Sequence, residues 1–222
     1  MIVPPAIEAE NLNRTFGRGS WLSGGSDIVA VRDATFKVAR GETLAIVGES
    51  GSGKSTIARM LVGLDRPTRG TIRLEGQDLS TLTGRDRRML GRRIQYVFQD
   101  PVASLNPRHR IGEILGSTLT GLAAMTGRAA RRARMEELLH HVGLEAESLQ
   151  RYPHEFSGGQ AQRIAIARAL AAEARIIVLD EPVSALDVSV QAQVLKLLDR
   201  LKSEFDLTYV FISHDLAVVE AI

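Results

Sequence analysis

The chain has 222 residues, of which 44% are hydrophobic and 24% are charged, as in an ordinary globular protein. It contains no cysteine, which excludes disulfides and thiolate metal sites, and no apolar run approaches the roughly 20 residues that span a bilayer. A formal net charge of +2 gives little support to nucleic-acid binding. The N-terminus lacks the pattern of a secretion signal, so we expect a cytoplasmic location.

The first half of the sequence predicts several strands and one helix. Short apolar or alternating runs bounded by Gly or Pro are typical of strands, and apolar residues every three or four positions are typical of helices. We expect a loop at Gly17–Asp27 and a helix at Ser55–Leu64. The expected strands are Ala6–Phe16, Ile28–Val38, Thr43–Val47, Thr71–Leu74 and Ile94–Phe98.

The second half begins with a helix-rich segment, residues 111–143, that has few strand signals and predicts a separate helical subdomain. Further helices are expected at Ser157–Ala172 and Val188–Lys202, and strands at Arg175–Asp180 and Thr208–Ile212. Alternating buried strands and helices predict an α/β fold with a largely parallel sheet. Ligands of such sheets bind at the carboxyl ends of the strands.

The segment Gly48-Glu49-Ser50-Gly51-Ser52-Gly53-Lys54-Ser55 fits the pattern G-x-x-x-x-G-K-[ST] between an expected strand and an expected helix. Glycines let backbone N–H groups curl around phosphate oxygens, and the helix N-terminus adds partial positive charge. Lys54 offers a charge to the β- and γ-phosphates, and Ser55 offers a hydroxyl to Mg²⁺. We therefore expect ATP to contact Gly48, Ser50, Gly51, Ser52, Gly53, Lys54, Ser55 and Thr56.

A second candidate site is the acidic pair Asp180-Glu181 after the apolar run 176–179. Alone, such a pair is commonly just the end of a strand, but a phosphate-binding loop in the same chain favours a functional interpretation. Asp180 would hold Mg²⁺ through water. Glu181 would point the other way if the strand persists, and would reach a water molecule in line with the γ-phosphate.

A third motif, Phe156-Ser157-Gly158-Gly159-Gln160, precedes an expected helix. A hydroxyl, two glycines and free N–H groups at a helix start form another anion-binding arrangement. One nucleotide rarely needs two phosphate-binding helix starts. The second is explained if it serves ATP that is bound by another chain.

With these motifs the sequence resembles the ATP-binding subunits of ABC transporters over nearly its whole length. The matching motifs are Walker A at Gly48–Ser55, the Q-loop at Gln99, the signature usually written LSGGQ at Phe156–Gln160, Walker B at Ile176–Glu181, the D-loop at Ser184–Asp187 and the switch histidine at His214. Phe16 lies where the family has an adenine-stacking aromatic residue, with Trp21 as a rival. Ala161 departs from the family, which usually has a basic residue there.

The resemblance implies a role for each motif. Glu181, His214 and Gln99 form the catalytic set, in which His214 hydrogen-bonds the γ-phosphate and Gln99 contacts Mg²⁺ or the lytic water. Ser55, Gln99 and Asp180 hold Mg²⁺. The residues that bind the γ-phosphate on the opposite subunit, or couple the two sites, are Ser157, Gly158, Gly159, Gln160 and Asp187.

The resemblance also implies a P-loop NTPase (RecA-like) core with an N-terminal antiparallel β portion and a helical subdomain. We expect one ABC ATPase domain over residues 1–222, with residues 1–98 and 160–222 forming the ATP-binding core and residues 99–159 forming the helical signature subdomain. Family members usually continue beyond the helix after His214. The C-terminal end is therefore expected to be truncated.

A narrower resemblance, at Phe98–Arg108 and Asp180–Gln193, is to importers of dipeptides, oligopeptides and nickel. It predicts an ATP-hydrolysing subunit that powers import of peptides or a related small solute. The expected partners are a second ATP-binding subunit, identical or related, permease subunits at the inner face of the cell membrane and, indirectly, a solute-binding protein.

Two other functions explain the sequence less well than a transporter does. A soluble ABC-type ATPase acting on nucleic acid or ribosomes usually carries a long coiled coil or charged insertion between the Q-loop and the signature, whereas residues 100–155 are short and helical. No nucleic-acid partner is therefore expected. A P-loop kinase or GTPase explains neither Phe156–Gln160 nor His214.

Overall fold

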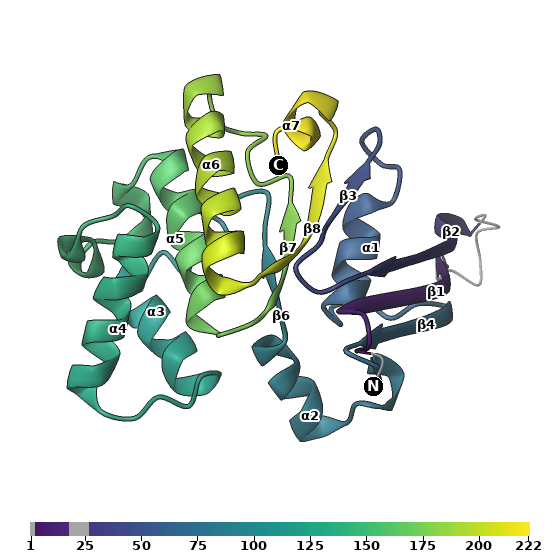
Figure 1. Ribbon diagram of the computed structural model, residues 1–222, viewed down its shortest axis with the longest axis horizontal. Coiled ribbons are helices and arrows are strands. Elements are labelled where there is room, and N and C mark those ends of the chain that lie inside the picture. Colours follow the sequence, from purple (N-terminus) through teal and green to yellow (C-terminus); the bar gives the residue numbers. More distant parts are fainter. Residues whose placement is uncertain (1–2, 18–26) are drawn as a thin grey trace, which may run out of the picture.

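A four-stranded parallel sheet forms the centre of the molecule (Figure 1). The computed structural model describes residues 3–17 and 27–222. The strands lie in the order β3 (Thr43–Val47), β8 (Thr208–Ser213), β7 (Ile176–Asp180) and β6 (Ile94–Val97), all parallel. Both β7 and β8 are buried along their whole length, which explains the runs of hydrophobic residues at 176–179 and 209–212.

Alternate residues of the parallel strands face two different hydrophobic cores. Ile177 and Leu179 of β7 join a core that contains the helices α3 (Ile111–Gly121), α5 (Gly158–Ala171) and α6 (Val188–Phe205). The intervening Ile176 and Val178 join a core built with α1 (Lys54–Leu61) and the second sheet. Helices therefore cover both faces of the parallel sheet, as expected for βαβ connections.

The second sheet is antiparallel and lies on the far side of α1 (Figure 1). Its strands are ordered β2 (Ile28–Val38), β1 (Ile7–Phe16), β4 (Arg69–Leu74) and β5 (Gln77–Asp78). The pairing of β1 and β2 shifts register more than once, which is typical of β-bulges.

The segment between β6 and α5 is helical and packs against α5. It contains α3 and α4 (Arg128–His141), and short 3-10 turns at Ala146–Gln150 and Pro153–Glu155. The remaining helices are α2 (Gly84–Met89) and α7 (Leu216–Glu220), and further 3-10 turns lie at Leu79–Thr81 and Leu90–Arg92. Over residues 3–17 and 27–222, the structure has no helix long and apolar enough to cross a membrane.

The predicted fold class is confirmed: a P-loop α/β core with a parallel sheet, an antiparallel β portion and a helical segment. The expected strand to Phe98 ends at Val97, and the expected helix from Ser55 to Leu64 runs from Lys54 to Leu61. The division into a core and a subdomain at residues 99–159 stays a prediction. Trp21 lies outside the described residues.

Candidate active site

A cavity of about 760 Å³ opens where the parallel strands end. Its volume falls within the usual range of small-molecule sites. The segment after β3 lines it, together with Gln99 after β6, Glu181 after β7 and His214 after β8. The alternation of strands and helices thus brings residues from four distant parts of the sequence to one edge of the sheet.

The loop between β3 and α1 requires glycine for two separate reasons. Gly51 and Gly53 have φ values of 81° and 95°, a region that L side chains rarely adopt. Gly53 is also crowded, because a Cβ built there would lie 2.1 Å from the carbonyl oxygen of Ala30 on β2. The loop can hold its shape against β2 only without a side chain at Gly53.

Lys54, the first residue of α1, folds back under this loop. Its Nζ donates hydrogen bonds to the carbonyl oxygens of Gly48 and Glu49, both at 2.7 Å. The side chain is buried and makes no ion pair with any residue that the structure describes. An ammonium group has three donors, so its charge and third N–H suit an anionic ligand in the cavity.

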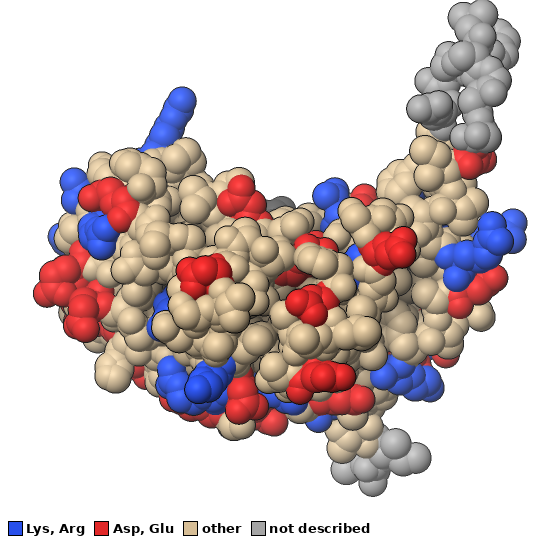
Figure 2. Space-filling view, turned by 90° about the horizontal axis from the view of Figure 1, so that it is seen from above, with Lys and Arg blue, Asp and Glu red and all other residues tan. Residues whose placement is uncertain are grey.

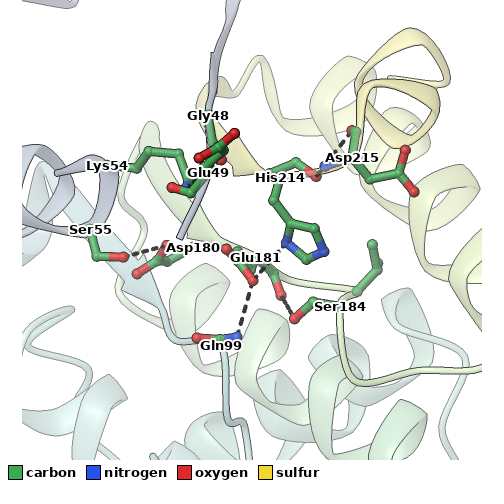
Figure 3. Close-up of polar contacts among 12 residues, drawn as sticks. Gly48, Glu49, Lys54, Ser55, Gln99, Asp180, Glu181, Ser184, His214 and Asp215 are labelled. Carbon is green, nitrogen blue, oxygen red and sulfur yellow. Dashed lines mark hydrogen bonds and ion pairs between the residues drawn. The ribbon is translucent and has the colours of Figure 1, made fainter. Parts of the chain in front are cut away.

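Ser55 and Asp180 meet at the adjoining corner of the site (Figure 3). The Ser55 hydroxyl donates to Asp180 Oδ1 at 3.2 Å, and Asp180 is 7% exposed. A hydroxyl and a carboxylate are hard oxygen ligands, and Mg²⁺ usually combines one or two carboxylates with substrate phosphates. These two residues therefore fit the magnesium ion that the nucleotide would carry.

Tyr96 on β6 is a contact of Asp180 that the sequence analysis missed. Its hydroxyl donates to Asp180 Oδ2 at 2.5 Å. Burial raises the pKa of Tyr96, and the bond to Asp180 raises it further. The signal available in the sequence was a tyrosine in the short strand Ile94–Val97, because a buried tyrosine hydroxyl usually has a hydrogen-bond partner.

Glu181 lies at the centre of a cluster of three side chains (Figure 3). Its Oε2 accepts a hydrogen bond from Gln99 Nε2 at 3.0 Å and lies 3.1 Å from His214 Nδ1. The strand does not persist through Glu181, so the expectation based on strand alternation is corrected. β7 ends at Asp180, and Glu181 has a φ of 47° with its N–H donating to the Ile212 carbonyl.

The signature segment lies outside this cavity, at the start of α5. Ser157 caps the helix: its Oγ accepts from Gln160 N–H at 3.3 Å, and its own N–H donates to Gln160 Oε1 at 3.1 Å. Gly159 packs against α6, where a Cβ would lie 2.4 Å from Val190 Cγ1. Ser157 and Gly158 are exposed.

Asp187 caps the neighbouring helix α6. Its Oδ1 accepts from Ser189 Oγ at 2.7 Å and from Val190 N–H at 3.0 Å. The hydrogen bond from the Ser189 side chain is the main cause that lowers the pKa of Asp187. The hydrogen bond from the Val190 backbone lowers it further. Asp187, Ser157 and Gly158 are exposed and lie at the N-termini of the neighbouring helices α5 and α6, whereas Gly159 is buried between these helices.

Phe16, at the end of β1, is 38% exposed and is not one of the residues that line the cavity. The Arg14 guanidinium lies over its ring, 4.3 Å from the centroid. The remaining predicted loop residues, Ser50, Ser55 and Thr56, line the cavity, whereas Ser52 lies in the loop but not at the lining. Whether Phe16 stacks on adenine stays a prediction.

A parallel sheet, a glycine-rich loop that leads from β3 into a helix, and an acidic pair at the end of β7 define a P-loop nucleotide-binding cassette. The model of the family described as ABC transporter matches residues 31–184. This chain belongs to that family.

The chain is 47% identical over 215 residues to the di/tripeptide transport ATP-binding protein DppF of Pseudomonas aeruginosa, covering 96% of this chain and 66% of the relative. It is 52% identical over 197 residues to the oligopeptide transport ATP-binding protein AppF of Bacillus subtilis, covering 88% and 60%. The chain thus spans about two thirds or less of the length of these relatives.

Among solved structures, the chain is similar to the ATP-binding cassette MJ0796, in a dimeric post-hydrolysis state bound to ADP and Pi. The TM-score is 0.84 at 31% identity, with 97% of this chain and 90% of that chain covered. A second neighbour is cbiO1 of Clostridium perfringens, part of the ABC transporter complex cbiONQ. Its TM-score is 0.79 at 28% identity, with 97% and 81% covered.

Proposed function

We propose that this chain is the subunit that binds and hydrolyses ATP to drive an ABC importer of peptides. The observation that carries the proposal is the convergence of Lys54, Ser55 and the Glu181 cluster on one cavity, with Asp180 bonded to Ser55 directly behind its lining. The peptide class rests on the relatives DppF and AppF, whose names describe peptide transport.

The phosphates of ATP would lie along the loop from Gly48 to Thr56. Backbone N–H groups and the start of α1 favour the negative charge, and Lys54 adds a full positive charge. Ser55 and Asp180 would hold Mg²⁺, which would neutralise part of the charge of the nucleotide's phosphates. ATP therefore binds with its terminal phosphate toward Glu181.

Hydrolysis requires a water molecule aligned with the γ-phosphorus. Glu181 accepts the proton of that water while the water oxygen forms a bond to phosphorus and the bond to ADP breaks. Gln99 and His214 both contact Glu181 Oε2, so they hold the carboxylate in place from two sides. When the γ-phosphate is present, His214 moves to hydrogen-bond it.

A second ATP-binding subunit, identical or related, would complete each site. Ser157, Gly158, Gly159 and Gln160 do not line the cavity of their own chain. They form a helix start suited to an anion, at which Ser157 and Gly158 are exposed. In a head-to-tail pair this surface would cover the γ-phosphate of the partner's ATP, and Asp187 would couple the two sites. The assembly would sit at the cytoplasmic face of the membrane through a permease.

The nucleic-acid alternative has less support. Figure 2 shows the molecule from the side toward which β3, β7 and β8 run, with acidic and basic residues interspersed. Nucleic-acid binding usually uses a concentrated basic patch. A peptide importer is consistent with the mixed surface, because its contacts are to proteins.

The proposal is tested by purifying the tagged chain from native membranes in mild detergent and measuring labelled dipeptide uptake in the same cells. We expect a polytopic membrane protein and an ATP-binding subunit to co-purify, and uptake to fall when Glu181 is changed to Gln. Stable co-purification with nucleic acid at moderate salt, with unchanged uptake, would contradict it.

A further inference from the structure

Tyr96 places a hydroxyl group inside the hydrophobic core next to the active site. β6 pairs with β7 in parallel, and Tyr96 lies opposite Val178 in that register. The residue is 9% exposed and packs in the same core as Ile94, Ile176 and Val178. A buried hydroxyl without a hydrogen-bond partner is unfavourable. The partner of the Tyr96 hydroxyl therefore indicates the role of this residue.

That bond is to Asp180, and it complements the bond from Ser55. Tyr96 donates to Oδ2 at 2.5 Å, whereas Ser55 donates to Oδ1 at 3.2 Å. The terminal torsion of an aspartate is broad, so a carboxylate that is held at one oxygen only can rotate. Donors on both oxygens define the plane of the Asp180 carboxylate and direct Oδ1 toward the start of α1.

The contact also joins two strand exits. Tyr96 precedes Gln99 by three positions, and Gln99 contacts Glu181, the neighbour of Asp180. The end of β6 is therefore bonded twice to the end of β7, once through each member of the acidic pair.

We infer that Tyr96 is a positioning residue for the metal-binding carboxylate: its hydroxyl orients Asp180 so that Oδ1 and the Ser55 hydroxyl face the same magnesium ion. The inference rests on the proposed function and adds to it a residue from outside the nucleotide-binding motifs. Contacts of this kind, made to a metal ligand and not to the metal, typically change metal affinity by about 10- to 100-fold when removed.

A second buried tyrosine provides the matched control. Tyr209 on β8 is fully buried, and its hydroxyl donates to the Leu198 carbonyl at 3.0 Å, a contact within the other core. Tyr96→Phe and Tyr209→Phe each remove one buried hydroxyl and one hydrogen bond. Only the first removes a contact with Asp180.

The experiment measures ATP affinity of the full chain with excess Mg²⁺ and with EDTA, for the unaltered chain and both phenylalanine variants. Mg²⁺ increases the ATP affinity of the unaltered chain by some factor. We expect that factor to be about 10-fold smaller in Tyr96→Phe. Its affinity in EDTA stays unchanged, and Tyr209→Phe keeps the full gain. An intact Mg²⁺ effect in Tyr96→Phe, or an equal loss in EDTA, overturns the inference.

A double-mutant cycle with Asp180→Asn separates positioning from loss of stability. We expect Tyr96→Phe to have no further effect on the Mg²⁺ dependence in the Asp180→Asn background. Additive effects overturn the inference, even if Tyr96→Phe lowers the melting temperature. If the unaltered chain shows no Mg²⁺-dependent ATP binding at all, the proposed function itself fails, and that result is distinct from failure of the Tyr96 variant alone.

Discussion

His214 Nδ1 lies 3.1 Å from Glu181 Oε2, although the two residues are separated in sequence by β8 and the whole of α6. The Glu181 side chain is largely buried, whereas that of His214 is about half exposed. Because Glu181 is anchored and His214 faces the cavity, the histidine can turn from the carboxylate to a phosphate without disturbing the fold.

Changing His214 to Ala removes one contact of Glu181 and, if the proposed function holds, one donor to the γ-phosphate. Removal of a donor of this kind typically lowers turnover by about 10²–10³-fold. We expect phosphate release to fall by that factor while ATP affinity changes little. The exposed His109 gives the control, and His109→Ala should release phosphate at the normal rate. Normal turnover in His214→Ala would remove the histidine from the catalytic set.

Changing Ser157 to Ala tests whether the signature acts on a second chain. We expect ATP-induced self-association, measured by sedimentation in the Glu181→Gln background, to be lost while the ATP affinity of the monomer is retained. The lost cap also costs about 1 kcal/mol of unfolding free energy.

Asp78→Ala controls for that cost, because Asp78 caps the 3-10 turn at Leu79–Thr81 by accepting from Ser80 N–H at 2.7 Å. The Asp78→Ala variant should lose a similar amount of unfolding free energy and should still self-associate when ATP is added. A large loss of monomer ATP affinity in Ser157→Ala would refute the assignment of Ser157 to the partner's nucleotide.

An alanine in the phosphate loop should lower the free energy of unfolding more at Gly53 than at Gly51, because only Gly53 is crowded. At Gly51 nothing lies within 4 Å of a new Cβ, so Gly51→Ala carries only the cost of a left-handed backbone, about 1–2 kcal/mol. At Gly53 the same cost is joined by overlap with the Ala30 carbonyl, which adds about 1–3 kcal/mol. Urea unfolding should therefore rank Gly53→Ala as clearly less stable, and equal midpoints would contradict the predicted packing against β2.

The features that the sequence predicts are those encoded by contiguous residues. The loop around Lys54 is a contiguous pattern, and the buried strands around Asp180 and His214 are apolar runs followed by polar residues, so their exits could be placed. α2 was missed because Gly84–Met89 has four charged residues and no apolar periodicity. β5 was missed because two residues, Gln77 and Asp78, carry no strand pattern.

The missed parts of the site depend on tertiary structure. The contact of Tyr96 with Asp180 follows from the register of β6 and β7, which no local pattern specifies. The direction of the Glu181 side chain follows from its φ of 47°, which departs from strand geometry immediately after β7. The contacts of Gln99 and His214 with Glu181 follow in turn from that backbone conformation.

The most direct test of the account is the rate of phosphate release at saturating Mg²⁺ and ATP after Glu181 is changed to Gln. Glu173→Gln is the matched control, because Glu173 is also a glutamate at positive φ (59°) but is exposed and does not line the cavity. We expect Glu181→Gln to bind ATP normally and to release phosphate about 10²–10⁴-fold more slowly, because the general base is lost, while Glu173→Gln is unaffected. Unchanged phosphate release in Glu181→Gln would contradict it.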